Sequence, residues 1–396
     1  MFNERAGVRV EIDGRGCIET QAGLMGHAVY GPYETLEPGK YGVEFQIKPL
    51  VEPADDRDPL IAHFDVVAGP QVRLAEGLVF RSLLTPDGRF VVHFETGERL
   101  SGVEYRLYVN GVEPLRLDDA PRARRIERVE PPPQRETLPA FFRNHVSDFG
   151  RLFIAGIGVS VRGEDVIASA KGFSFYARTA DDLNFVDEVL LRNCYNILTA
   201  APVCVIDIGM NIGLTSLRLA SSPNVREVHA FEPFPMTFAR AAANVSLNPA
   251  QQAKIAMHNI GMFDSDTELT THINSSDSGS YSVFGADRGE SVTIQLRDAG
   301  ATLRPIIESA QAQGLLVVLK VDCDGSEYAV FRSLAASGLI GRIAAYMVEY
   351  HRGQGTSHEL TYRLTEAGFA VVDLGYSGNN GFFYAVRLGR DEGFAR

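Results

Sequence analysis

Hydrophobic and polar residues alternate along the first 120 positions of the chain. The clearest stretches are VRVEI (8–12), YGVEFQIKP (41–49), LIAHFDVV (60–67), RFVVHFE (89–95) and VEYRLYVN (103–110). A period of two is that of a strand with one buried face, and turn signals such as Asn110-Gly111 separate the stretches. Many short strands at regular spacing predict an all-β antiparallel sandwich or jelly roll over residues 1–122.

A basic and proline-rich stretch, ARRIERVEPPPQRETLP (123–139), follows these strands. Three consecutive prolines favour an extended polyproline conformation, so the stretch is predicted to be a semi-rigid linker. The second domain is then expected to span residues 140–396. Near its start, FIAGIGVSV (153–161) and GFSFYA (172–177) are interpreted as strands.

From about residue 181, strand-like and helix-like segments alternate. The apolar runs at 203–208, 227–232, 315–322 and 343–350 are typical of buried strands, and amphipathic segments lie between them. Two more strand-like segments, FAVVDL and GFFYAVRL, close the series. Repeated strand–helix units predict an α/β fold with a doubly wound, Rossmann-like sheet and an antiparallel addition at one edge.

The composition, 45% hydrophobic and 22% charged residues, is that of an ordinary globular protein. A net charge of −12 disfavours nucleic acid as a partner, and the basic cluster between Arg122 and Arg128 is interpreted as solvated linker. The start of the chain lacks the layout of a signal peptide, and no apolar run is long enough for a membrane span. We therefore expect a cytoplasmic protein, with homo-oligomerisation left open.

The four cysteines, Cys17, Cys194, Cys204 and Cys323, lie far apart and form no CxxC pair. Cys204 and Cys323 fall in apolar runs, where a thiol behaves as a small buried hydrophobe. Neither a disulfide framework nor a zinc site is expected.

The stretch VIDIGMNIGLTSL (205–217) joins a strand to a helix through a glycine turn. It lacks the G-x-G-x-x-G of a dinucleotide loop and the Lys-Ser/Thr of a phosphate loop. An acid directly before the turn repels phosphates and favours a cationic ligand. S-adenosylmethionine has a cationic methionine end and two free ribose hydroxyls. Asp207 is therefore predicted to face the cation, and Glu232, which ends the second strand, to hold the hydroxyls.

Four motifs, VIDIGMNIGLTSL, VHAFEPFPMTF, LLVVLKVDCDGSEYAVFRSL and VEYH, together resemble the FkbM-type S-adenosylmethionine-dependent methyltransferases. The resemblance covers roughly residues 175–388, and the first domain only weakly resembles β-sandwich modules of bacterial polysaccharide-related proteins. It implies a class I methyltransferase-like fold and methyl transfer to a hydroxyl of a sugar, glycan or natural product. Met210 and Asp324 depart from the family pattern, which usually has a small residue and Glu at these positions.

The glycine turn and the strand ends supply the predicted cofactor-binding residues, because ligands of doubly wound sheets bind at the carboxyl ends of the strands. These residues are Asp207, Gly209, Asn211, Gly213, Thr215, Glu232, Ile260, Gly261 and Asp322. Ile260 and Gly261 end the third strand and are expected to touch the adenine.

The same geometry gathers a second set of residues on the substrate side: Asp322, Asp324, Glu327, Glu349 and His351. Transfer to a hydroxyl needs a base. His351 titrates in the right range, Asp322 is the rival base, and Glu349 completes the catalytic candidates. A Mg²⁺ ion held by Asp322, Asp324 and Glu349 is a further alternative. Asp324 and Glu327 also suit the start of the next helix, where acids complement the dipole.

The polar loop at 274–289, with Tyr281, is predicted either to cover the substrate or to be an inert excursion. Three hypotheses follow for the chain. It is an O-methyltransferase acting on a sugar or related molecule, a carbohydrate-recognition protein with a non-catalytic methyltransferase-like domain, or a nicotinamide-dependent oxidoreductase. The chemistry of the glycine turn disfavours the last.

Overall fold

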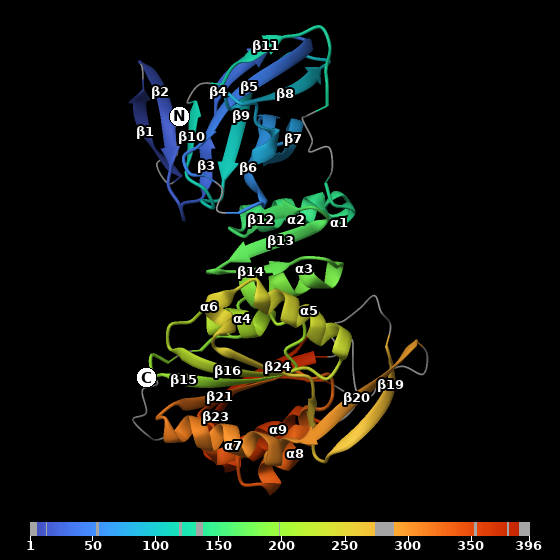
Figure 1. The fold of residues 1–396 in the computed structure, drawn as a ribbon. Coiled ribbons are helices and arrows are strands. Elements are labelled where there is room, and N and C mark those ends of the chain that lie inside the picture. Colours follow the sequence, from blue (N-terminus) through green and yellow to red (C-terminus); the bar gives the residue numbers. More distant parts are fainter. Residues whose placement is uncertain are drawn as a thin grey trace. The chain divides into compact units, whose positions relative to one another are not determined.

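The computed structural model describes residues 6–12, 14–52, 55–118, 121–131, 138–197, 199–273, 289–351, 355–377 and 380–387. The chain divides into two compact units (Figure 1). The first comprises the residues up to Ala170 together with Tyr176–Arg178, and the second comprises Lys171–Phe175 and the residues from Thr179 onward. Strand β14 (Phe173–Tyr176) falls at this division.

The first unit is an antiparallel β-sandwich, as the alternating pattern predicted. One sheet contains β1 (Gly7–Ile12), β2 (Arg15–Thr20), β10 (Leu115–Asp118), β5 (Gly39–Pro49), β11 (Ala123–Arg125) and β8 (Arg89–Thr96). The other contains β13 (Asp165–Ala170), β12 (Gly158–Arg162), β6 (Asp58–Ala68), β9 (Leu100–Val109), β3 (Gly26–Val29), β4 (Pro32–Leu36) and β7 (Val72–Phe80). Inward residues of both sheets, such as Phe45 of β5 and Phe64 of β6, share one buried core.

The boundary of the first unit differs from the one expected from the sequence. Part of the expected linker forms β11, which pairs with β5. Residues 140–170, expected in the second domain, belong to the first unit because β12 extends its sheet through β6. The start of the segment 153–161 is helical rather than extended, since α1 (Ala140–Asn144) and α2 (Val146–Ile154) precede β12.

The second unit contains a seven-stranded sheet with the order β17-β16-β15-β21-β22-β24-β23. Its strands are β15 (Val203–Ile208), β16 (Val225–Phe231), β17 (Ile255–His258), β21 (Leu316–Val321), β22 (Ala345–His351), β23 (Phe369–Ser377) and β24 (Asn380–Arg387). The strands from β17 to β22 are parallel, and β24 is antiparallel to both of its neighbours. The strand order reverses between β15 and β21, so a ligand site is expected there.

Helices cover both faces of this sheet (Figure 1). On one side lie α3 (Ala180–Val186), a π-helical turn (Asp187–Leu191), α4 (Leu214–Ala220), α5 (Pro235–Ser246) and α6 (Pro249–Gln252). On the other lie α7 (Ala299–Ala312), α8 (Glu327–Ala336) and α9 (Ser357–Glu366). A small sheet adds β18 (Gly261–Phe263), β19 (Thr267–Ile273) and β20 (Glu290–Asp298). No helix among the described residues is long and apolar enough to cross a membrane.

Candidate functional site

The glycine turn after β15 brings two backbone segments together at the switch point. Gly209 has a φ of 80°, and a Cβ at this position would lie 1.7 Å from the carbonyl oxygen of Asp322. Only glycine fits such an approach. Gly213, with a φ of 82°, is the N-cap of α4. The turn therefore exposes backbone atoms to a ligand where side chains would otherwise stand.

Asp207 lies beneath this turn, and its side chain is fully buried. One carboxylate oxygen is 3.1 Å from Lys320 Nζ, and the other accepts a hydrogen bond of 2.6 Å from the Ser216 hydroxyl. Asp207 is absent from the described residues that line the cavity at the strand ends. Its predicted direct contact with a cationic ligand stays a prediction, and the neighbouring strand supplies one cation, Lys320.

Lys320 connects Asp207 to the turn. Its ammonium group donates a hydrogen bond of 2.5 Å to the Gly209 carbonyl oxygen and lies 3.4 Å from Asp322 Oδ2. Burial opposes the charge on Lys320, but the carboxylates of Asp207 and Asp322 outweigh this effect and raise its pKa. A permanent cation therefore holds the turn against β21.

Glu232 directly follows β16 and reaches back to the glycine turn. Its two oxygens accept hydrogen bonds from the backbone amides of Asn211, at 3.1 Å, and Phe234, at 3.0 Å. Burial raises the pKa of Glu232 to about 7, although these amides and Lys320 act in the opposite direction. Each oxygen keeps a lone pair for a further donor, as the predicted contact with ribose hydroxyls requires.

A cavity opens between these strand ends and encloses about 880 Å³ including its mouth. The described residues that line it are Phe185, Glu188, Ile208, Gly209, Asn211, Phe231, Glu232, Pro233, Phe234, Gly261, Met262, Leu296, Asp322, Cys323, Asp324, Ser326, Glu349, His351 and Asn380. Its walls are thus apolar around Gly261 and acidic around Asp322.

Several predicted site residues lie behind the cavity wall. Gly213 and Thr215 belong to the start of α4, and Ile260 packs against the main core. Glu327 is fully buried at the start of α8, where the helix-dipole interpretation placed it. Tyr281 and all but the last residue of the loop 274–289 lie outside the described residues.

The acidic wall is organised around Tyr195. Its hydroxyl lies 3.1 Å from Asp322 Oδ2 and 3.2 Å from Glu349 Oε2, and the ring is fully buried. Asn380 donates a hydrogen bond of 2.8 Å to the other oxygen of Glu349. Burial, followed by the charges of Asp322 and Glu188, raises the pKa of Glu349 to about 7.

His351 ends β22 and is surrounded by acids. One ring nitrogen lies 3.4 Å from Asp324 Oδ1 and the other 3.3 Å from Glu327 Oε1, which also accepts the His351 backbone amide at 2.5 Å. Burial alone would lower its pKa, but the hydrogen bond with Glu327 and the charges of Asp324, Glu327 and Asp322 raise it to about 9. His351 is therefore protonated at neutral pH, unlike the free base expected from the sequence.

Tyr195, Glu188 and Asn380 were not predicted as site residues. Tyr195 and Glu188 come from the segment before β15, whose apolar pattern indicated only a helix. Asn380 begins β24, and register pairs it with His351. Pairing the expected antiparallel edge strand with β22 would have placed Asn380 opposite His351 and so indicated it as a site residue.

Two polar atoms of the cavity residues have no hydrogen-bond partner among the described residues. They are Asn211 Oδ1 and Ser326 Oγ, and both are buried. Unpaired buried polar atoms are costly, so these two suit donors and acceptors of a bound ligand. Together with the Gly209 approach and Glu232, they fit a nucleoside-bearing ligand with hydroxyl and ammonium groups.

The strand order, with its antiparallel β24 between β22 and β23, and the glycine turn at the switch point define a class I, S-adenosylmethionine-dependent methyltransferase fold. Residues 207–371 match the family model described as the methyltransferase FkbM domain. This match to part of the second unit confirms the resemblance drawn from the four motifs.

Three solved structures are among those similar to this chain. One is methyltransferase FkbM from Methylobacillus flagellatus KT, with 13% identity, a TM-score of 0.32, and coverage of 50% of this chain and 47% of that chain. Another is M. capricolum TrmK in complex with S-adenosyl-homocysteine, with 9% identity, a TM-score of 0.30, and coverage of 50% and 66%. The third is human methyltransferase 10 domain containing protein, with 13% identity, a TM-score of 0.31, and coverage of 62% and 94%. No curated protein matches the sequence.

Proposed function

We propose that this protein is an S-adenosylmethionine-dependent O-methyltransferase whose acceptor is a hydroxyl group of an uncharged sugar or related polyol. The observation that carries the proposal is the division of the cavity. Glu232 and the glycine turn form one wall, and the hydrogen-bonding group of Tyr195, Asp322 and Glu349 forms the other. The chain provides a place for the cofactor beside a place for a hydroxyl.

Glu232, Asn211 and Gly209 hold the cofactor in this proposal. The Glu232 carboxylate accepts hydrogen bonds from the two ribose hydroxyls, and the backbone around Gly209 approaches the methionine end of the cofactor. Apolar residues near Gly261, including Met262 and Leu296, enclose the adenine. S-adenosylmethionine supplies an electrophilic methyl group when bound.

The acidic wall suits a neutral acceptor with several hydroxyl groups. Asp322, Glu349 and the Asn380 amide offer acceptors and donors that bind hydroxyls in a defined orientation. The same carboxylates, with the net charge of −12, repel phosphorylated sugars and nucleic acid. This is why we favour a neutral sugar or glycan.

Glu349 is the proton acceptor in this proposal. With a pKa of about 7, it exchanges a proton readily at neutral pH, which is the range in which a general base is most effective. His351, with a pKa of about 9, already carries its proton and instead orients Asp324. The Tyr195 hydroxyl lies within hydrogen-bond distance of both Asp322 and Glu349, and Asp322 is the alternative proton acceptor.

The acidic side chains of the cavity lie beside the Lys320 ammonium group, and we propose that turnover needs no Mg²⁺. Ligand atoms of Asp322, Glu349 and His351 lie within 4.8 Å of one another, as in metal sites. However, Lys320 Nζ lies 3.4 Å from Asp322. This positive charge opposes a divalent ion at this position.

The test measures methyl transfer from labelled S-adenosylmethionine to a panel of neutral oligosaccharides and sugar phosphates, with and without Mg²⁺. We expect transfer to neutral acceptors only, equal in both buffers. Glu349→Gln should lower kcat by about 10²–10⁴-fold with cofactor affinity nearly unchanged. Glu359→Gln, on α9, is the matched control and should behave as the parent.

Two outcomes would contradict the proposal. Binding of a nicotinamide cofactor without S-adenosylmethionine would assign the fold to redox chemistry. Glycan binding without methyl transfer to any acceptor would indicate a carbohydrate-recognition protein with a non-catalytic domain.

A further inference from the structure

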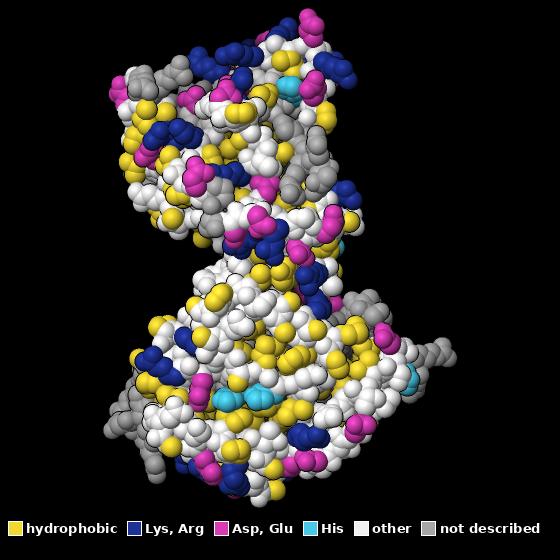
Figure 2. Space-filling model, in the orientation of Figure 1, with side chains coloured by type: hydrophobic (Ala, Val, Ile, Leu, Met, Phe, Trp, Pro, Cys, Tyr) yellow, Lys and Arg dark blue, Asp and Glu magenta, His cyan; other side chains and the backbone are white. Residues whose placement is uncertain are grey.

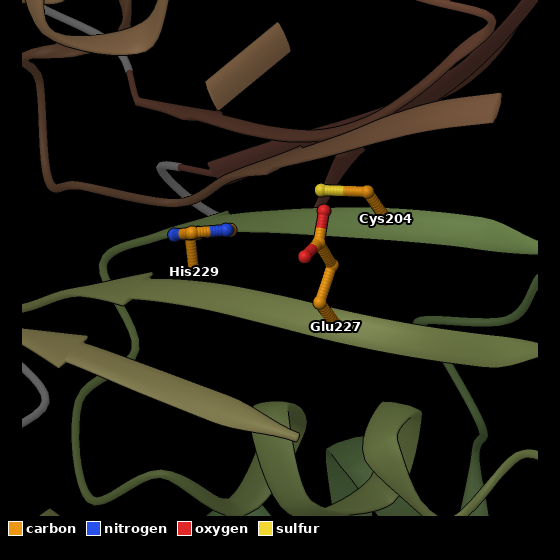
Figure 3. Close-up of side chains that lie close together, drawn as sticks. All are labelled: Cys204, Glu227 and His229. Atoms are coloured by element: carbon orange, nitrogen blue, oxygen red, sulfur yellow. The ribbon is translucent and has the colours of Figure 1, made fainter. Parts of the chain in front are cut away.

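A second group of metal-ligating side chains lies in the α/β unit, away from the cavity. It consists of Cys204 on β15 and of Glu227 and His229 on β16, and we call it the Cys204 cluster. Sγ of the cysteine, a carboxylate oxygen and a ring nitrogen all lie within 4.8 Å of one another. Figure 3 shows the three side chains on one face of the two strands, with one ring nitrogen of His229 turned toward Glu227.

Strand register produces this arrangement. Cys204 pairs with Glu227 in the parallel ladder between β15 and β16. Glu227 and His229 are two residues apart, so their side chains point to the same face of the sheet. Cys204 is near the start of β15, whereas Ile208 at its end lines the cavity. At about 3.3 Å per residue along the strands, Cys204 lies about 13 Å from Ile208, and His229 lies about 7 Å from Phe231, which also lines the cavity.

The surroundings of the cluster favour metal binding. His229 Nδ1 and Nε2 of the stacked His258, whose ring centre is 5.8 Å away, are buried without a hydrogen-bond partner in the described part of the chain. Cys204 is fully buried and reduced, while Glu227 and His229 are partly exposed and give an ion a path from solvent.

We propose that Cys204, Glu227 and His229 bind a Zn²⁺ ion that joins β15 to β16. Thiolate, imidazole and carboxylate are the ligands of Zn²⁺, at about 2.0–2.3 Å, whereas Mg²⁺ and Ca²⁺ take oxygen ligands. Tetrahedral binding at these lengths separates ligand atoms by about 3.3–3.6 Å, which a side-chain movement of about 1 Å achieves. Water completes the fourth position.

Binding exchanges a proton for the metal. The S–H bond of Cys204 breaks, a Zn–S bond forms, and the proton leaves to solvent without any change of oxidation state. The Cys204 thiol is buried, and the release of its proton on binding can be measured. No motif in the sequence indicates the site, because its ligands are brought together by strand register and not by a CxxC spacing.

The ion has a structural role in this proposal. Strand β15 continues into the Gly209 turn, and β16 ends at Glu232, so both strands carry cofactor-binding residues at their other ends. A metal that joins the start of β15 to the middle of β16 stabilises the α/β unit without contacting the reacting groups. Bound Zn²⁺ should therefore raise the melting temperature of the protein.

The experiment uses the full chain, reduced and freed of metal with a chelator, and titrates it with Co²⁺ and then Zn²⁺. We expect one equivalent of Co²⁺ with thiolate charge-transfer absorption and tetrahedral visible bands, displacement by Zn²⁺, and release of about one proton. Cys204→Ala should abolish the charge-transfer absorption. Glu227→Gln and His229→Gln should each weaken Zn²⁺ binding about 100-fold or more.

Cys17→Ala and His351→Gln are the matched controls and should bind Co²⁺ as the parent does. Circular dichroism of the metal-free proteins shows whether each variant folds. Glu227→Gln changes a partly exposed side chain and should leave the core intact. The proposal is overturned if no stoichiometric metal binds. It is equally overturned if the charge-transfer absorption persists in Cys204→Ala or disappears in His351→Gln.

Discussion

Lys320 and Asp207 form a fully buried ion pair, 3.1 Å apart, across the switch point of the sheet. Register sets them side by side on β21 and β15. Because Lys320 also holds the Gly209 carbonyl oxygen, the pair determines where the glycine turn stands. Removing the Lys320 charge leaves the Asp207 carboxylate buried without this cation, whereas removing Asp207 leaves Lys320 beside Asp322.

Lys320→Met should therefore lower the free energy of unfolding of the α/β unit by about 3–5 kcal/mol, the usual cost of breaking a buried pair. Urea unfolding measures this change. Lys254→Met is the matched control, because Lys254 bonds only to carbonyl oxygens, of Ala220 and Ser222, and should cost about 1 kcal/mol. Equal losses in the two variants would show that the pair with Asp207 contributes nothing specific.

Glu232→Gln should weaken S-adenosylmethionine binding by about 10- to 100-fold, because a hydrogen bond to a charged group contributes about 1.5–3 kcal/mol. With a pKa of about 7, the Glu232 carboxyl becomes ionised as the pH rises through neutrality. Parental affinity should therefore tighten from pH 6 to pH 8 in calorimetry, and the Gln variant should lose this dependence. A pH dependence that persists in the variant would assign the titration to another group.

His351→Gln should change how stability depends on pH. The pKa of His351 is raised from 6.5 to about 9 in the folded state, so its contribution is fully present below pH 6.5 and is lost as the pH rises through 9. The parent should exceed the variant by on the order of 2–3 kcal/mol at pH 6, and the difference should shrink by pH 9.5. His358→Gln, at an exposed position of α9, should keep the parental profile. A difference that does not vary with pH would refute the assigned protonation.

A fragment of residues 171–396 should fold and bind S-adenosylmethionine, because it contains the whole second unit. A fragment of residues 139–396 should be less soluble, since it retains β12 without its partner β6 and exposes Val159 and Val161. Circular dichroism, light scattering and cofactor titration compare the two. Aggregation of the shorter fragment alone would show that its core needs the first unit.

The sequence predicted the parts of the site that follow directly from strand ends. Glu232 and Asp322 come immediately after apolar runs, and their positions at the carboxyl edge of the sheet follow from parallel topology. Asp207 also ends such a run, but its ion pair could not be predicted. Its partner, Lys320, is more than a hundred residues distant and is placed beside it by strand register.

The protonation of His351 could not be predicted from the sequence either. The pKa of a histidine depends on its neighbours, and the sequence does not show which groups surround His351. In the structure Glu327, the first residue of α8, lies beside its ring. Tyr195 was missed because a buried aromatic residue in an apolar segment carries no sign of its hydroxyl partners. Burial and register, rather than motif spacing, determine these contacts.

The position of β24 has a consequence for the synthesis of the protein. This strand follows β23 in the chain, yet it lies between β22 and β23 in the sheet. During synthesis, the edge of β22 opposite β21 has no partner strand until β24 leaves the ribosome. Strand β23 cannot join the sheet before then, because it pairs with β24. The Asn380 contact with Glu349 forms in the same step. The acidic wall is therefore completed only after β24 has left the exit tunnel.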